Sequence, residues 1–476
     1  MAFSFIGGGN IEVSPFKFKQ LTDLKLVRKI NQHARLSVCG VIAAELKDRP
    51  IHDLTRETII EVNQVDFNSG KTLIFKGIVS KAEVKMVMDV YYLEVEATSL
   101  TQLMDVKLKS RSFQNVNLTY QDLIKQVVNE YNGDIKDYAS QKQKIGKVII
   151  QWNETDWQFL TRLASHFNTG LIPYLLSDTP KLYLGIPEAN GEPPKLENFH
   201  YRVSKKLSDY RYASENAQPG IEEDDFISYE VESERLLELG AAVSFRNTRL
   251  YVYEATSFLE NGVLKHLYLL APQKGLSQKT AYNEQIVGLS LEGKVIDVAK
   301  DKVRVHLTID PEQKKEEAFW FPYSSVYTAE GNSGWYCMPE LGDWVKIYFG
   351  SKKEEEGVAI SSIRKDSSES KHNKLSDPNI KYLRTKSGKE LMFSPEEIVI
   401  TGKDDQIYIK LNDKDGITIY SQKAVKIIAK QDLALESEAA KVIIKSKEGI
   451  NISCDSSELK MDKTSVIITG DEVKTN

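Results

Sequence analysis

The chain has 476 residues, of which 41% are hydrophobic and 28% charged, and its formal net charge is only -5. This length predicts about three domains, and the near-neutral charge argues against a basic surface that would bind nucleic acid. Because the N-terminal segment has no signal-peptide pattern and no stretch reaches the 18 or more apolar residues of a membrane span, we expect cytoplasmic synthesis and storage.

Residues 1–100 are expected to form a first β-barrel. Thr, Val and Ile dominate this region, and turn-forming residues separate its apolar runs. The predicted strands are Leu26–Ile30, Ala34–Ile42, Glu57–Val65, Thr72–Val79 and Val90–Ala97.

Residues 101–170 are expected to contain two helices. The first covers Asn117–Tyr131, where Thr119 and Asp122 are placed for a capping box. The second covers residues 153–169, and its apolar stripe predicts that one face is buried.

The start of this second helix has its own pattern. Asn153 is expected to cap it, while Glu154 and Asp156 lie where the helix dipole favours negative charge. Gly170 is expected to end the helix.

The pattern then returns to strands. A second β-barrel is predicted for residues 171–285, and five short strands over residues 286–364 indicate a small barrel of the oligonucleotide/oligosaccharide-binding (OB) type. The five are Leu291–Val298, Lys302–Ile309, Phe319–Tyr323, Trp344–Phe349 and Val358–Ile363. Residues 365–380 are expected to be a charged, serine-rich linker.

Residues 381–476 contain an internal repeat. Nine triplets with apolar first and third residues recur about every eight residues, and alternate residues of a strand point to one side. The repeated pairs are Ile398/Ile400, Ile407/Ile409, Ile417/Ile419, Val425/Ile427, Leu433/Leu435, Val442/Ile444, Ile450/Ile452, Leu459/Met461 and Val466/Ile468.

This short period favours three chains wound about one axis, each supplying one side of a triangular β-helix. The apolar residues of all nine triplets would then form the core of a homotrimer. The alternative from the pattern alone is a monomeric sandwich of nine strands.

Three segments together resemble the central spike proteins of contractile injection systems, which include the VgrG proteins of type VI secretion and the hub and spike of contractile phage tails. Glu154–Leu163 is similar to the hub signature of that family. Trp335–Phe349 is similar to the end of its OB domain, and Thr385–Phe393 to its passage from OB domain to spike.

The resemblance implies a mainly β protein: a hub of two β-barrels with inserted helices, a five-stranded OB domain and an intertwined trimeric spike. Its implied role is structural and non-enzymatic, joining an inner tube to a membrane-piercing needle. The resemblance does not distinguish type VI secretion from a phage-tail-like bacteriocin or an extracellular injection particle. The competing hypothesis is a trimeric tail fibre or adhesin that binds or degrades surface polysaccharide.

The resemblance also implies partners. These are two further copies of the chain, the inner tube and baseplate proteins, and the target-cell envelope during injection. After firing, the protein would be expelled from the particle into that envelope or the extracellular space.

The hub signature contributes six candidate residues: Glu154, Asp156, Trp157, Phe159, Leu160 and Arg162. For Arg162 and Glu154 two alternatives remain, an ion pair that fixes the helix against a barrel or two ordinary surface charges.

The end of the repeat is expected to dock a separate tip protein, and the resemblance implies that this protein is of the type that carries a Pro-Ala-Ala-Arg (PAAR) signature. Val466, Ile468 and Gly470 are the candidate contacts, since a prism whose last strand edges stay open invites pairing. In the alternative, the polar tail folds back and covers the end.

No catalytic, metal or cofactor site is predicted. Gly288–Val295 departs from a phosphate-binding loop at its last position, and the turn Asn412–Gly416 lacks the ligands of a calcium loop. Cys39, Cys337 and Cys454 lie far apart, so they are expected to be reduced, with no disulfide or zinc site.

Overall fold

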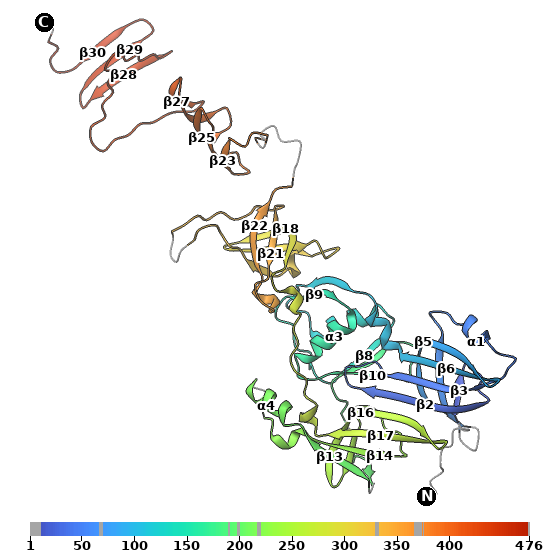
Figure 1. The fold of residues 1–476 in the computed structure, drawn as a ribbon. Helices are drawn as coiled ribbons and strands as arrows, with labels where there is room; N and C mark the ends of the chain where they lie inside the picture. The colour runs from blue at the N-terminus through green and yellow to red at the C-terminus, as the bar shows by residue number, and fades with distance from the viewer. Residues whose placement is uncertain are drawn as a thin grey trace. The chain divides into compact units, whose positions relative to one another are not determined.

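The computed structural model describes residues 11–65, 70–188, 191–197, 200–216, 220–328, 333–365, 374 and 376–474. These residues are mainly β, as predicted, and the chain divides into two compact units, Met1–Asp366 and Ser367–Asn476 (Figure 1). Within the described part of the chain, no helix combines the length and apolar character that a membrane crossing requires.

A twelve-stranded sheet forms the base of the N-terminal unit. Its strand order is β1-β4-β5-β6-β3-β2-β16-β17-β14-β13; in addition, β15 pairs with β16, and β12 pairs with β15. The strands are β1 (Ile11–Ser14), β2 (Gln20–Lys29), β3 (Arg35–Ile42), β4 (Ile59–Val65), β5 (Lys71–Val87), β6 (Val90–Ser99), β12 (Lys195–Leu196), β13 (Tyr201–Lys205), β14 (Ile227–Ser233), β15 (Ala242–Phe245), β16 (Thr248–Glu260) and β17 (Val263–Ala271).

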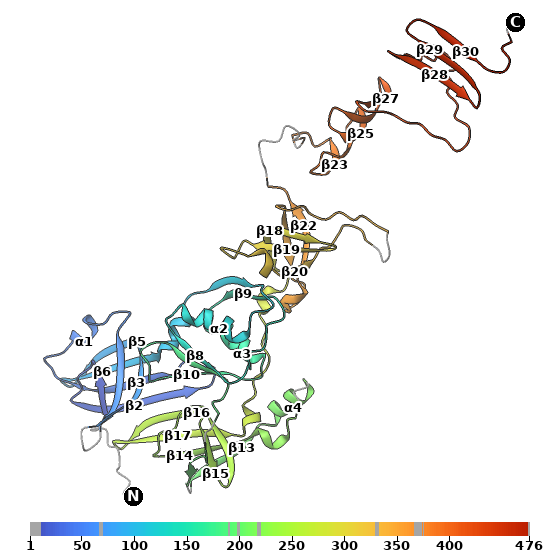
Figure 2. The ribbon, with the colours of Figure 1, turned by 180° about the vertical axis from the view of Figure 1, so that it is seen from behind.

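The two predicted N-terminal barrels are not confirmed as separate bodies. Strand β2 pairs with β16, so that Val27 lies opposite Thr256 and the two halves share one sheet. Two separate apolar cores, one on each half, pack against this sheet. Short helices α1 (Arg49–His52) and α4 (Leu207–Glu215) lie at its margins (Figure 2). The 3-10 turns of this region are η3 (Glu223–Phe226) and η4 (Gln273–Leu276).

A layer of helices and short strands, residues 100–184, packs beside the sheet. Its core contains apolar side chains from both of its helices, which are α2 and α3. The elements are η2 (Leu100–Asp105), β7 (Lys109–Phe113), α2 (Tyr120–Asn129), β8 (Asp134–Asp137), β9 (Ile149–Glu154), α3 (Asp156–Ser165), β10 (Leu171–Tyr174) and β11 (Lys181–Leu184).

Helix α2 lies within the predicted range Asn117–Tyr131 and is capped by Thr119. The Thr119 side chain accepts a hydrogen bond from the Asp122 backbone N–H, and its hydroxyl donates to the Asp122 carboxylate. The predicted capping box is only partly formed, because the Asp122 carboxylate accepts from the Thr119 hydroxyl and not from the Thr119 backbone N–H.

A five-stranded sheet follows, with all five strands where the sequence predicted them. Its order is β20-β19-β18-β21-β22, and a bridge between Tyr323 and Ala359 joins the two end strands. The elements are η5 (Glu284–Ile286), β18 (Ser290–Ala299), β19 (Lys302–Leu307), η6 (Lys315–Glu317), β20 (Trp320–Pro322), β21 (Trp344–Tyr348), η7 (Glu354–Glu356) and β22 (Val358–Ile363). We call this the 290–363 sheet.

Strand β9 is shared by two cores. Ile149 faces the core of the 100–184 layer, whereas its neighbours Val148 and Ile150 face the core of the 290–363 sheet. Because alternate residues of a strand point to opposite sides, one short strand contributes to both cores. The layer and the 290–363 sheet are therefore packed together along β9.

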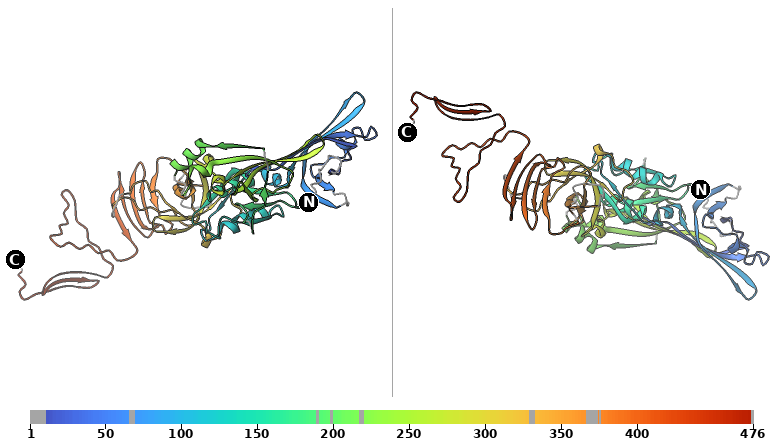
Figure 3. Two further views of the ribbon diagram at one scale, coloured as in Figure 1. Left: turned by 90° about the horizontal axis from the view of Figure 1, so that it is seen from below. Right: turned by 90° about the horizontal axis from the view of Figure 1, so that it is seen from above.

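The C-terminal unit contains two antiparallel sheets, in the orders β23-β24-β25-β26-β27 and β28-β29-β30 (Figure 3). Most of the predicted linker lies outside the described residues. The strands are β23 (Lys381–Arg384), β24 (Glu390–Phe393), β25 (Glu397–Lys403), β26 (Ile407–Asn412), β27 (Gly416–Ser421), β28 (Gly449–Cys454), β29 (Ser457–Asp462) and β30 (Val466–Thr469).

The triplets of these strands align into rows. Direct cross-strand partners lie on the same face of a sheet, so the register builds two rows on one face of each sheet. In the first sheet the rows are Leu383-Leu391-Ile400-Ile409-Ile419 and Phe393-Ile398-Leu411-Ile417, and in the second they are Ile450-Met461-Val466 and Ile452-Leu459-Ile468. We call these the apolar rows.

The strands predicted at the three central triplets do not form in the single chain. Between Lys423 and Glu448 the described residues contain no strand and no backbone–backbone hydrogen bond. A strand needs a neighbour to pair its backbone groups, and this chain supplies none there. The affected residues are Val425, Ile427, Leu433, Leu435, Val442 and Ile444.

The shared strand generates a prediction. Replacing Ile150 with Ala should cost about 3 kcal/mol of stability and lower hydrogen-exchange protection in β18, β19 and β21. Ile149→Ala is the matched control, because it removes the same atoms from the opposite face and should lower protection in α2 and α3 instead. Identical protection patterns for the two variants would contradict the shared-strand description.

Candidate functional site

Helix α3 begins directly at the end of strand β9. Asn153 adopts a positive φ of 50° and turns the chain, and Thr155 caps the helix by accepting a hydrogen bond from the Gln158 N–H. The Gln158 side chain accepts in return from the Thr155 N–H, which completes a capping box. The expected cap at Asn153 is wrong, because Glu154 is still part of β9; the Asn153 side chain donates to Gln285 instead.

All six residues of the predicted signature are buried, although half of them are polar or charged. Glu154 lies at the end of β9 and the other five lie on α3. Their exposed fractions are Glu154 8%, Asp156 0%, Trp157 5%, Phe159 0%, Leu160 0% and Arg162 3%. Phe159 stacks on Phe113, and Leu160 belongs to the core of the 100–184 layer.

The Arg162 guanidinium is held by three acceptor groups, which are two carboxylates and a backbone carbonyl. Its Nε and Nη2 donate to the two carboxylate oxygens of Glu154 at 2.9 and 2.8 Å, and Nη2 also donates to the Ile150 carbonyl at 2.8 Å. Its Nη1 donates to Glu354 at 2.8 Å. Of the two alternatives for Arg162 and Glu154, the structure contains the ion pair.

Glu354 brings a distant part of the chain into this network. It lies in η7, between β21 and β22, and its side chain is buried. Burial raises the pKa of the Glu354 carboxyl, and the charge of Arg162 opposes that shift. We call Arg162, Glu154, Glu354 and the Ile150 carbonyl the Arg162 joint, because it ties α3 and β9 to the 290–363 sheet.

Further hydrogen bonds connect the 100–184 layer to the 290–363 sheet. Asp310, next to β19, accepts hydrogen bonds from the backbone N–H and the hydroxyl of Ser112 in β7. Gln114 donates to the Val305 carbonyl at 3.2 Å and accepts from the Phe319 N–H at 3.1 Å. The Arg162 joint is therefore the charged part of a longer interface.

Asp156 is the centre of a second buried cluster. Its carboxylate accepts hydrogen bonds from Arg111 Nη2 at 2.6 Å, the Tyr131 hydroxyl at 2.7 Å and Gln151 at 2.9 Å, and from the Lys109 ammonium. Burial of the carboxyl opposes ionisation, but these donors outweigh it and hold the pKa of Asp156 below its ordinary value. The cluster joins the first turn of α3 to β7 and to the end of α2.

Trp157 packs against a hydrogen-bond network of His, Thr and Asp side chains, which are residue types that also occur in catalytic sites. Its ring lies 4.3 Å from that of His33, which contacts the Thr101 hydroxyl at 2.8 Å and Asp105 at 3.2 Å. Thr101 is only 1% exposed, so a substrate cannot reach its hydroxyl. We therefore interpret this hydrogen-bond network as structural.

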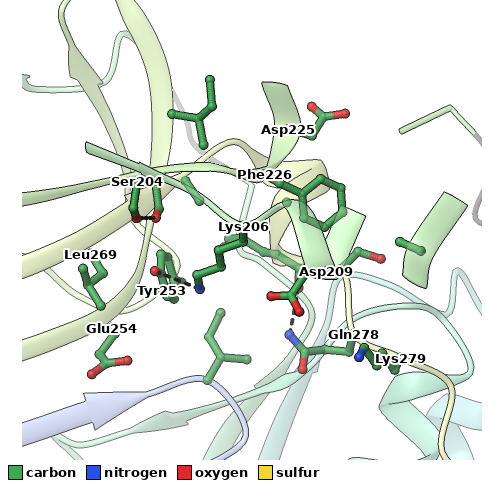
Figure 4. A pocket seen from close by; sticks show the side chains of 18 of the residues that line it. Ser204, Lys206, Asp209, Asp225, Phe226, Tyr253, Glu254, Leu269, Gln278 and Lys279 are labelled. Atoms are coloured by element: carbon green, nitrogen blue, oxygen red, sulfur yellow. Dashed lines mark hydrogen bonds between the residues drawn. The ribbon is translucent and has the colours of Figure 1, made fainter. Parts of the chain in front are cut away.

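The described residues contain no group of three or more His, Cys, Asp or Glu side chains placed to hold a metal ion. A cavity of about 570 Å³ lies between α4, η4 and the large sheet (Figure 4). Lys29 on its wall pairs with Glu254, and the Lys206 ammonium lies 5.1 Å from the centre of the Tyr253 ring. This combination gives no basis for assigning a reaction.

Residues 54–168 match the family model of the phage tail baseplate hub (GPD). No curated protein matches the chain. Among solved structures, the c3393 protein of E. coli, a type VI secretion system component with structural similarity to the T4 bacteriophage tail proteins gp27 and gp5, is 12% identical. That match has a TM-score of 0.51 and covers 74% of this chain and 99% of the other.

The half-lidded PdpA-VgrG complex of Francisella matches with a TM-score of 0.52 and 11% identity, covering 86% of this chain and 87% of that chain. The lidded form of the complex gives a TM-score of 0.53 over 86% of this chain and 79% of the other. At 11–12% identity, these structural matches show that the chain shares the fold of those proteins.

The hub match contains the whole signature segment. Residues 54–168 span α2, β9 and α3, so Glu154–Leu163 lies inside the region that matches the hub model. The Arg162 joint and the Asp156 cluster both begin within this hub segment.

Sequence reasoning missed the partners of the signature residues. Glu354 is 192 positions away from Arg162, and nothing in its local sequence, three consecutive glutamates, marks it as buried. Lys109 and Arg111 were not predicted as partners of Asp156, and Tyr131 was predicted only as part of the first helix. Arg162 lies on the opposite side of the predicted helix from Trp157 and Leu160, so helical periodicity gave no signal that it would be buried.

A first prediction concerns the Arg162 joint. Arg162→Met should destabilise the protein by roughly 3 kcal/mol, because two carboxylates would lose their shared cation. Glu356→Gln is the matched control, since Glu356 lies in the same turn but is exposed. Denaturant titration measures both. Equal stability of Arg162→Met and the parent protein would contradict a structural role for the joint.

A second prediction concerns pH. Because the folded pKa of Asp156 lies below the ordinary value of an aspartate, its ionised form contributes stability at pH values above that ordinary value, and this contribution is lost as the pH falls through the folded pKa. Asp156→Asn should therefore be less stable than the parent protein at pH 7. The difference in free energy of unfolding between the two proteins should shrink below about pH 4. Denaturant titration at several pH values measures it, and a difference that does not change with pH would refute the prediction.

Proposed function

We propose that this protein is the structural hub and spike of a contractile injection system. Three copies would form a hub that adapts an inner tube to a needle, with an OB-type collar and a C-terminal triangular β-helix. The role is non-enzymatic. The hub-domain match and the hub–spike fold support the general role, and the apolar rows of the C-terminal unit carry the trimeric needle.

The apolar rows lack a cover in the single chain. Ile417 is 71% exposed, Ile419 61%, Val466 65% and Ile468 59%. Large exposed aliphatic faces of this kind mark interaction surfaces. The same rows from two further copies would cover these side chains, with equivalent residues at the same level along the needle axis.

The segment from Lys423 to Glu448 supports the same proposal. Its triplets keep the period of the repeat, yet its backbone groups have no strand partner within the chain. Strands from other copies would pair these groups, so this part of the needle would form only on association.

The remaining roles extend from this arrangement. The inner tube and baseplate proteins would bind the hub, and a PAAR-type tip protein would cover Val466, Ile468 and Gly470. The particle would be assembled in the cytoplasm, and the target-cell envelope would be met on firing. A tail fibre or adhesin that binds polysaccharide has no comparable support, because it does not require a hub domain.

The trimer generates a prediction with a matched pair of variants. Light scattering of the full chain should give about 162 kDa, three times 54.0 kDa. Ile427→Asp should weaken or abolish the trimer, because unpaired carboxylates near the axis cost several kcal/mol each. Lys426→Asp, at the middle of the same triplet, should leave it intact. A stable monomer of the parent protein would refute the proposal.

Tip docking generates a separate prediction. Ile468→Asp should leave the trimer mass unchanged but reduce the tip protein recovered with assembled particles at least severalfold, since it places charge on the last apolar row. Ile467→Asp, on the opposite face of the same strand, is the control. Full recovery of the tip protein with Ile468→Asp would exclude docking at this row.

A further inference from the structure

An arm projects from the 290–363 sheet between β20 and β21 (Figure 2). It consists of residues 324–328 and 333–343 among those described, and the Trp335 N–H donates to the Tyr327 carbonyl at 2.8 Å between its two segments. An isolated two-stranded ribbon is at best marginally stable in water. The arm therefore needs a surface to pack against.

The arm carries an uncovered apolar surface of large side chains. Within one chain it is tied down near its base, where the Tyr336 hydroxyl donates to the Lys300 carbonyl at 2.7 Å and Met338 packs on the core. The exposed residues are Val326 (94%), Tyr327 (57%), Trp335 (60%), Tyr336 (76%) and Leu341 (57%). Tryptophan and tyrosine are the residue types that contribute most to protein–protein contacts.

The same sheet has a second apolar surface, on the outside of β21 and β22. Val345, Ile347 and Ala359 face the core, so their neighbours point outward. The outward partners pair across the two strands, Tyr348 with Val358 and Trp344 with Ile363, while Ile360 lies beside Lys346. Lys365 covers Trp344. We call Tyr348, which is 40% exposed, and the partly buried Val358, Ile360 and Ile363 the β21–β22 outer surface.

Two different apolar surfaces on one module suit a head-to-tail interface, which closes into a ring when the rotation between copies permits. We infer that the arm of each copy packs on the β21–β22 outer surface of the next copy around the ring. This inference rests on the proposed trimer, because it requires a neighbouring copy of the same module. It adds an exchange of arms that the apolar rows of the C-terminal unit do not require.

Cys337 lies in the arm and is exposed, so it can carry a probe. Replacing Cys39 and Cys454 with Ser leaves it as the single thiol for benzophenone maleimide. Irradiation of the full-length trimer should give bands of two and three chains on a denaturing gel, and peptide mass spectrometry should map the bonds to β21–β22. Cross-links confined to one chain, or between chains but away from β21–β22, would overturn the inference.

Subunit exchange provides a second measurement. Trp335→Ala and Tyr348→Ala should each speed the exchange of chains between labelled and unlabelled trimers about tenfold, and the double variant should be less than additive because both changes remove one contact. Val106→Ala, a 72% exposed residue outside both surfaces, is the control. Additive effects, or rates equal to the control, would count against arm exchange.

The outcomes separate the two proposals. A monomeric parent protein would overturn both the proposed trimer and the arm exchange. A trimer of about 162 kDa whose Cys337 cross-links stay within one chain would overturn the arm exchange alone. A trimer with interchain cross-links at β21–β22 supports both.

Discussion

The N-terminal unit depends on how one buried guanidinium is satisfied. Arg162 lies on helix α3, whose apolar side chains belong to the core of the 100–184 layer, and a buried charge there is costly unless several acceptors surround it. Glu154 supplies two acceptors from the preceding strand, and Glu354 supplies another from the 290–363 sheet. Because these acceptors come from separate parts of the chain, the charge can be buried only when hub segment and sheet are both folded and correctly placed.

The two units use apolar surface in opposite ways. In the N-terminal unit the aliphatic side chains of β9 are covered on both faces by the chain itself. In the C-terminal unit the apolar rows are regular but uncovered. The first arrangement gives cores that are complete in one chain, whereas the second has the regularity of a core but lacks the other half of it. Under the proposed trimer, the N-terminal cores could form before the chains associate.

Local patterns in the sequence were enough to predict the elements but not their long-range partners. The five strands of the 290–363 sheet and the two helices of the hub segment follow from alternation and helical periodicity. The cap at Thr155 was missed because β9 extends one residue beyond the Asn that seemed suited to the role. The pairing of β2 with β16 and the contact of Arg162 with Glu354 join residues about 200 positions apart, and a single sequence contains no local signal for either.

The sharing of β9 also restricts how this segment can change in length. Because its side chains alternate between two cores, a single inserted residue would exchange every inward and outward position beyond the insertion. Side chains of β9 that now face one core would then face the other side of the strand. Glu154 would likewise point away from Arg162. Substitutions of similar volume are tolerable along β9, whereas insertions and deletions are tolerable only in the loops that flank the strand and its helix.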